Sequence, residues 1–150
     1  MTAARALSAV LALASFLLGL LYAVSYLGMP SLVRRPLPPG QESLVVTIES
    51  FGPVWPGLFL LAGTAVALSA TFPGRRSLVV AHMGAAFAWT FYGGSILVGA
   101  MLTQPPVPIV LGSMALLFPA LHVVCALIWL QYAGLFRSPG GRACMTKGLE

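Results

Sequence analysis

The stretch "IVLGSMALLFPALHVVCALIWLQYA" (109–133) has no acidic residue, no lysine and no arginine, and one histidine, His122, near its middle. A helix needs about 20 apolar residues to cross the ~30 Å hydrocarbon core of a bilayer. The stretch is long enough, so it predicts a transmembrane helix that carries a histidine inside the membrane. An intramembrane ionisable residue normally faces the interior of a helix bundle.

Three more stretches are also apolar and long enough to cross a bilayer: 6–27, 54–72 and 77–102. The chain as a whole is 59% hydrophobic and 7% charged, whereas a soluble domain carries about 25% charged residues. We therefore predict an all-α integral membrane protein with four transmembrane helices in an antiparallel bundle. The 150 residues form a single membrane domain in this prediction, and residues 134–150 form a flexible basic tail.

The positive charges favour one orientation. With four spans, the N-terminus, the 73–76 turn and the C-terminal tail share one side of the membrane, and the positive-inside rule makes that side cytoplasmic. The residues that set this topology are Arg5, Arg75, Arg76, Arg137, Arg142 and Lys147. We predict a multi-pass protein of the cell (inner) membrane with both termini in the cytoplasm. An excess of arginine over lysine, with much alanine and glycine, indicates a bacterial or phage origin.

The segment between the first two spans is expected outside the cell. It begins as a short Pro-rich loop, and "ESLVVTIES" (42–50) predicts a short ordered element at the membrane interface. Tryptophans prefer the two interfaces of a bilayer. We therefore expect Trp55 in the outer aromatic belt and Trp129 toward the inner one.

Small residues recur at alternating spacings of four and three in three of the spans, which keeps them on one helical face. Helices associate in lipid through such close contacts, so these faces are predicted to pack inside the bundle. The candidate packing residues are Ser8, Ala12, Ser15, Gly19, Ala81, Ala85, Ala88, Ser95, Gly99, Gly112, Ala115, Pro119, His122 and Ala126. Tyr22 and Tyr26 continue the series in the first span, while Gly63, Ala67 and Ala70 form a weaker one in the second.

His82 and His122 are the only histidines and so the only candidates for a bis-histidine haem. Counted from the assumed span ends at about 1.5 Å per residue, His82 lies ~7 Å and His122 ~15 Å from the inner face. Axial ligands must face one iron at nearly one depth, so this estimate counts against haem. We instead expect His122 to point inward and to bond a hydroxyl of Ser15, Thr64 or Thr90, or a carbonyl freed by Pro119.

The residues that many membrane enzymes and transporters require are missing from the spans. Proton-coupled transport usually places an Asp or Glu in the membrane, and thiol oxidoreductases need a cysteine pair, but the spans contain neither. Neither G-x-S-x-G nor H-E-x-x-H occurs. We predict no catalytic residue, no metal site and no cofactor.

The sequence thus favours a small non-enzymatic membrane protein that acts through helix–helix and protein–protein contacts, as an accessory subunit of a larger membrane complex. Its expected partners are the lipid bilayer and other membrane-protein subunits or further copies of itself, with no nucleic acid. Two alternatives stay open. One is an oligomeric pore former resembling a phage holin, and the other is a haem- or quinone-associated redox subunit.

Overall fold

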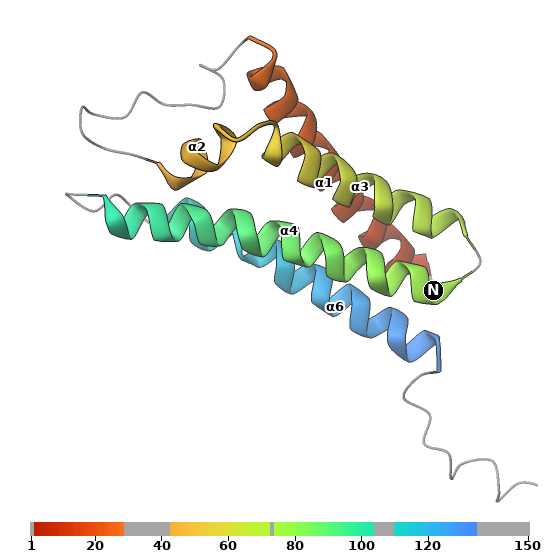
Figure 1. The fold of residues 1–150 in the computed structure, drawn as a ribbon. Coiled ribbons are helices and arrows are strands. Elements are labelled where there is room, and N and C mark those ends of the chain that lie inside the picture. The colour runs from red at the N-terminus through yellow and green to blue at the C-terminus, as the bar shows by residue number, and fades with distance from the viewer. Residues whose placement is uncertain (1, 29–42, 73, 104–109, 135–150) are drawn as a thin grey trace, which may run out of the picture.

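The computed structural model describes residues 2–28, 43–72, 74–103 and 110–134. Among these residues there are six helices and no strand (Figure 1). They are α1 (Thr2–Tyr26), α2 (Leu44–Glu49), α3 (Val54–Thr71), α4 (Arg75–Leu102), α5 (Val110–Ala115) and α6 (Leu117–Tyr132). Four helical segments are long and apolar enough to cross a membrane, namely α1, α3, α4 and the α5–α6 segment. The prediction of an all-helical chain with four such helices is therefore confirmed.

The ends of the helices differ from the predicted span ends by at most four residues. The largest difference is at the start of α1, and α4 begins at Arg75 rather than at residue 77. The fourth span is interrupted at Leu116, three residues before Pro119. Proline lacks the amide proton that would bond one turn back, and its ring crowds the preceding turn. The break between α5 and α6 lies within this preceding turn.

Helices α1 and α3 form one closely packed pair, and two glycines allow the close approach. A Cβ at Gly19 would lie 2.7 Å from the backbone nitrogen of Leu60, and a Cβ at Gly63 would lie 2.7 Å from that of Phe16. Higher numbers on α1 meet lower numbers on α3, so the two helices run in opposite directions.

Helix α4 packs against α5 and α6 as the second pair (Figure 1). Gly93 lies against Ala115 and Leu116, and Gly112 lies against Leu97. Along these contacts the residue numbers rise on α4 while they fall on the α5–α6 segment, so α4 and that segment run in opposite directions. Helix α3 packs on α4 and joins the two pairs, while α1 has a smaller contact with α6.

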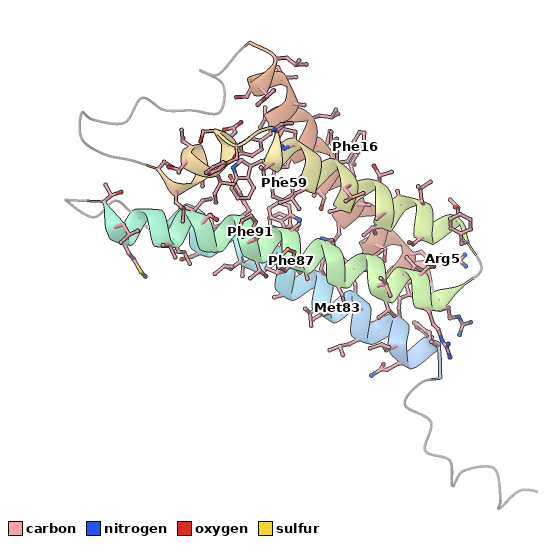
Figure 2. The ribbon with its side chains drawn as sticks, in the orientation of Figure 1. Arg5, Phe16, Phe59, Met83, Phe87 and Phe91 are labelled. Carbon is pink, nitrogen blue, oxygen red and sulfur yellow. The ribbon has the colours of Figure 1, made fainter. Side chains whose placement is uncertain are left out.

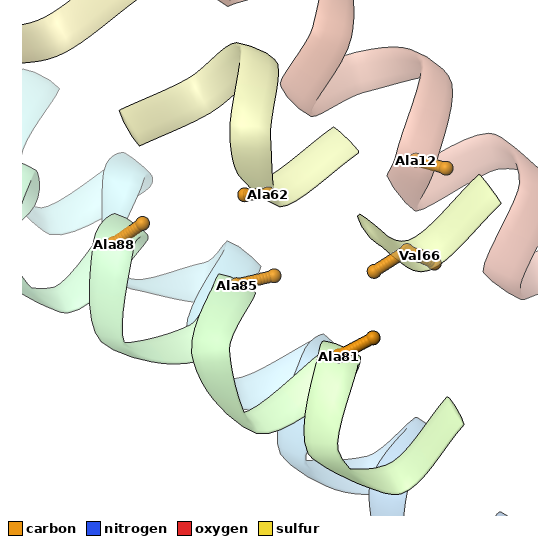
Figure 3. Close-up of a cluster of buried hydrophobic side chains, with 6 residues drawn as sticks. All are labelled: Ala12, Ala62, Val66, Ala81, Ala85 and Ala88. Atoms are coloured by element: carbon orange, nitrogen blue, oxygen red, sulfur yellow. The ribbon is translucent and has the colours of Figure 1, made fainter. Parts of the chain in front are cut away.

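The centre of the bundle is made of small side chains, as Figure 3 shows for α1, α3 and α4. This cluster consists of Ala12, Ala62, Val66, Ala81, Ala85 and Ala88. Small side chains let helix backbones approach closely, which is how helices gain van der Waals contact in lipid. All fourteen candidate packing residues are buried. Tyr26, Ala67 and Ala70, which continue the series in the sequence, are exposed.

Three of the topology-setting residues lie in the described part of the chain. Arg5, Arg75 and Arg76 are all exposed, and Figure 2 shows Arg5 near the first turn of α1. The Arg75 guanidinium donates to the carbonyl of Tyr132, which ties the start of α4 to the end of α6. Arg137, Arg142 and Lys147 lie outside the described residues, as do most of the basic tail and the Pro-rich loop.

Candidate functional site

The two histidines meet in the interior of the bundle. The Nδ1 atoms of His82 on α4 and His122 on α6 are 2.9 Å apart, so one ring donates a hydrogen bond to the other. Both side chains are 0% exposed. The chain has only these two histidines, and the fold brings them together across 40 residues of sequence.

A serine connects the histidine pair to the first helix. Ser8 Oγ lies 2.9 Å from His82 Nε2, and the Trp129 indole N–H donates to the same oxygen at 3.1 Å. Ser8 and Trp129 are 1% and 2% exposed. We name Trp129, Ser8, His82 and His122 the histidine chain, because they form one continuous line of hydrogen bonds that joins α1, α4 and α6.

The histidine chain is the first of three polar contacts between α1 and α4. Farther along, the Trp89 indole N–H donates to Ser15 Oγ at 2.9 Å, and the hydroxyls of Tyr22 and Tyr92 are 2.7 Å apart. We call the contacts Ser8–His82, Ser15–Trp89 and Tyr22–Tyr92 the α1–α4 polar series. Residue numbers rise together on both helices, so α1 and α4 run in the same direction.

The spacing of these residues explains why they line up. Ser8, Ser15 and Tyr22 are seven residues apart on α1, as are His82 and Trp89 on α4. A period of seven returns to nearly the same side of a helix. One side of α1 therefore presents a hydrogen-bonding group about every 10 Å to the same neighbouring helix.

An aromatic cluster surrounds the tyrosine end of the series. Phe59 lies between α3 and α4 (Figure 2), with its ring 4.8 Å from that of Trp89 and 5.2 Å from that of Tyr92. The short helix α2 covers this end, held by the Trp55 indole N–H, which donates to the carbonyl of Val45 at 3.0 Å.

Helix α2 also places a carboxylate next to the tyrosines. Glu49 is buried, with 3% of its surface exposed, and interacts electrostatically with both Tyr22 and Tyr92. The described part of the chain thus has two buried polar centres at opposite ends of α1. One is built on imidazoles and the other on a carboxylate and two phenols.

Several expectations about the histidines are wrong. His122 does point inward, but its partner is His82 and not a hydroxyl: Ser15 accepts from Trp89, Thr64 is exposed, and Thr90 bonds its own helix at Ala86. The estimate of the two depths is wrong because it started from assumed positions of the helix ends. Counted from Arg75, where α4 begins, His82 lies ~10 Å along the helix. The depths of His82 and His122 then differ by only ~5 Å, and the two side chains bridge that difference.

Two of the tryptophans lie near helix ends and point into the bundle. Trp55 is the second residue of α3, and Trp129 lies three residues before the end of α6. Their side chains are 0% and 2% exposed, and their place in the interfacial belts stays a prediction. Each indole N–H is satisfied inside the bundle, by Val45 and Ser8. A buried tryptophan usually needs such a partner, and here the indoles serve as hydrogen-bond donors between elements.

The geometry of the pair does not fit a haem iron. Two axial nitrogens on opposite sides of an iron, each at about 2 Å as in histidine–metal bonds generally, would be about 4 Å apart with a porphyrin between them. The observed direct Nδ1–Nδ1 hydrogen bond leaves no such space. Within the described ranges, no group of three or more His, Cys, Asp or Glu side chains is placed to hold a metal ion.

The histidine chain ends at the second ring nitrogen of His122. His122 Nε2 is buried and has no hydrogen-bond partner within the described residues. An imidazole nitrogen is either a donor or an acceptor, according to the tautomer. The line of hydrogen bonds that begins at Trp129 therefore ends at His122 Nε2. A row of hydroxyl and imidazole groups of this kind can bind a proton and share it between neighbouring nitrogens.

Comparison with known proteins gives no further guide to the chain. No family model, no curated protein and no solved structure matches it.

Proposed function

We propose that this chain is a non-enzymatic multi-pass membrane protein that acts through helix–helix contacts, as an accessory subunit of a larger membrane complex. The observation that carries the proposal is a groove of about 500 Å³ between α1 and α3 on the outside of the bundle. Most of the groove is lined by small residues. They are Ser8, Ala9, Ala12, Gly63, Thr64, Ala67 and Ala70.

A groove of small residues suits a helix as its occupant. In lipid, helices associate where small side chains let the backbones approach, and interhelical hydrogen bonds add to the contact. The exposed side chains of Leu13, Phe16 and Leu68 also line this groove. We therefore assign it to a transmembrane helix of a partner subunit rather than to a loop or a soluble domain.

Thr64 supports a helix with a polar side chain as the occupant. It lies ten residues into the eighteen-residue α3, about 15 Å from its start, and its hydroxyl has no bond to any described residue. The hydroxyls of Thr71, Thr90 and Thr103 instead bond carbonyls of their own helices. A hydroxyl without a partner in hydrocarbon is costly, and a donor or acceptor on the incoming helix would satisfy it.

The charges supply the proposed orientation. The end of the bundle with Arg5, Arg75 and Arg76 is placed in the cytoplasm by the positive-inside rule. On this proposal the protein lies in the inner membrane of a bacterium, both termini are cytoplasmic, and α2 covers the outer end of the bundle.

Mild detergent extraction with photo-crosslinking tests the proposal. A photoreactive residue at position 67, in the groove, should capture a membrane protein that co-purifies in fixed ratio. The same residue at position 120, exposed on α6 outside the groove, should not.

Two substitutions make the test specific. Ala67→Leu fills the groove and should weaken partner retention by about tenfold or more. Thr64→Val keeps the shape and removes the hydroxyl, for an expected loss of about threefold. Ala120→Leu is the matched control and should retain the partner. Extraction as a single chain with no fixed-ratio protein, or with only lipid captured at position 67, would contradict the proposal.

A further inference from the structure

The histidine chain has two possible arrangements of its protons when both rings are neutral. In the first, Ser8 donates to His82 Nε2, His82 Nδ1–H donates to His122 Nδ1, and His122 Nε2 carries a proton. In the second, His82 Nε2–H donates to Ser8 and His122 Nδ1–H donates to His82. Both arrangements keep every hydrogen bond of the histidine chain.

One additional proton is also compatible with the geometry. A doubly protonated His82 donates from Nε2 to Ser8 and from Nδ1 to His122 Nδ1, and His122 keeps its proton on Nε2. Ser8 Oγ then accepts from both Trp129 and His82, which its two lone pairs allow. Hydrogen bonds to a charged group are stronger than those between neutral groups, so this arrangement holds the added charge in place.

A second additional proton is not compatible with it. With both rings doubly protonated, two N–H groups would face each other across the 2.9 Å that separates the Nδ1 atoms. No acceptor remains between them, and two like charges lie side by side in a buried site. The contact between α4 and α6 at this level would have to open.

We propose that His82 and His122 form a binding site for one additional proton. The two rings share this proton, and Ser8 Oγ accepts a hydrogen bond from the protonated pair. The site lies where α1, α4 and α6 meet, so protonation state and helix packing are coupled there. Ser8 also lines the groove between α1 and α3, but the inference requires neither an occupant of that groove nor a partner subunit.

No carboxylate among the described residues lies beside the pair, so the charge of an added proton is stabilised only by the hydrogen bond to Ser8 and the bond between the two rings. From α1 the facing group is Ser8, and from α6 the titratable neighbour is Cys125, a buried free thiol one turn beyond His122. Glu49, the one acid in the described ranges, lies beside Tyr22, fourteen residues or ~21 Å along α1 from Ser8. Arg5 and Arg75 are exposed near the end of the bundle.

The experiment uses the fact that the chain has only two histidines. The full chain, labelled with ¹⁵N in histidine alone, is placed in nanodiscs, and its ring nitrogens are followed by NMR as the pH is lowered from 8. Tryptophan fluorescence monitors the fold in parallel. We expect uptake of one proton per chain, with the signals of both rings moving at one common midpoint while the fold is intact.

Each other outcome of this titration overturns the proposal. Two protons taken up with the fold intact would mean two independent sites, and movement of one ring alone would mean that the proton is not shared. The absence of any uptake until the fluorescence reports unfolding would mean that the pair binds no proton. The titration of the unmodified chain therefore tests whether the pair binds one shared proton, and no variant is needed for that test.

Two serine substitutions test the role of Ser8. Ser8→Ala removes the acceptor of the His82 Nε2 proton and should move the midpoint by about one pH unit toward acid. Ser15→Ala is a matched control, since Ser15 is equally buried on the same helix and also accepts an indole N–H. It should leave the midpoint unchanged, and equal shifts in both variants would contradict the role of Ser8.

Discussion

Gly63 sets the distance between α1 and α3. A Cβ there would lie 2.7 Å from the Phe16 nitrogen and 2.8 Å from the Ala12 carbonyl oxygen, and these backbone atoms cannot rotate away. Gly57 on the same helix has nothing within 4 Å of the corresponding position. The two glycines thus have the same helix propensity, but Gly63 faces the backbone of α1 and Gly57 faces open space.

Gly63→Ala should therefore lower the free energy of unfolding by about 1–3 kcal/mol, the usual cost of overpacking. Gly57→Ala should be neutral or slightly stabilising, because alanine favours a helix by up to about 1 kcal/mol over glycine. Reversible unfolding in mixed micelles with increasing SDS measures both. Equal stability of the two variants would show that α1 and α3 do not approach at Gly63.

At the scale of single residues, the sequence predicts burial better than it predicts partners. His122 is on the small-residue face, so its inward orientation is predictable from spacing alone. Its bond to His82 is not, because His82 lies one position off the Ala81–Ala85 face and its depth depends on where α4 begins. The constant difference of 74 residues between Ser8 and His82 and between Ser15 and Trp89 is a signal in the sequence, but it is meaningful only once two helices are known to run parallel.

At the scale of elements, α2 is the piece that the sequence describes least. Hydropathy predicts the four long helices, because a bilayer imposes their length. The pattern of 42–50 predicts only a short ordered element, since its β-branched residues favour a strand as much as a helix. Its helical form is set by packing, with Trp55 bonded to Val45 and with Ile48 against the aromatic cluster.

Trp55→Phe should release α2 while the long helices stay packed. Phenylalanine keeps most of the ring contacts and removes the N–H that Val45 accepts, and the loss of one hydrogen bond costs about 1 kcal/mol. Hydrogen exchange should then accelerate in residues 44–49 and remain slow in α4. Unchanged exchange in α2 would show that the apolar contacts alone hold it.

At the scale of the whole molecule, the end of the bundle that carries Arg5, Arg75 and Arg76 should face the cytoplasm. Compartment-sensitive reporters fused after Glu150 and inserted in the 36–42 loop should give opposite readings, cytoplasmic for the first and external for the second. An external reading after Glu150 would invert the proposed orientation. Orientation follows from charge asymmetry across a membrane, whereas partner identity depends on another chain, so the sequence predicts the first and not the second.

The hydrogen bond between His82 and His122 joins α4 to α6 in the interior of the bundle, and it can be observed directly. In the chain labelled with ¹⁵N in histidine alone, a scalar coupling passes between two nitrogens only when they share a hydrogen bond. We expect a cross-peak between the two Nδ1 atoms at neutral pH, and the cross-peak should survive dilution of each labelled chain with unlabelled copies. The absence of this coupling, with imidazole N–H protons that exchange freely with water, would contradict the packing of α4 against α6 at the histidine pair.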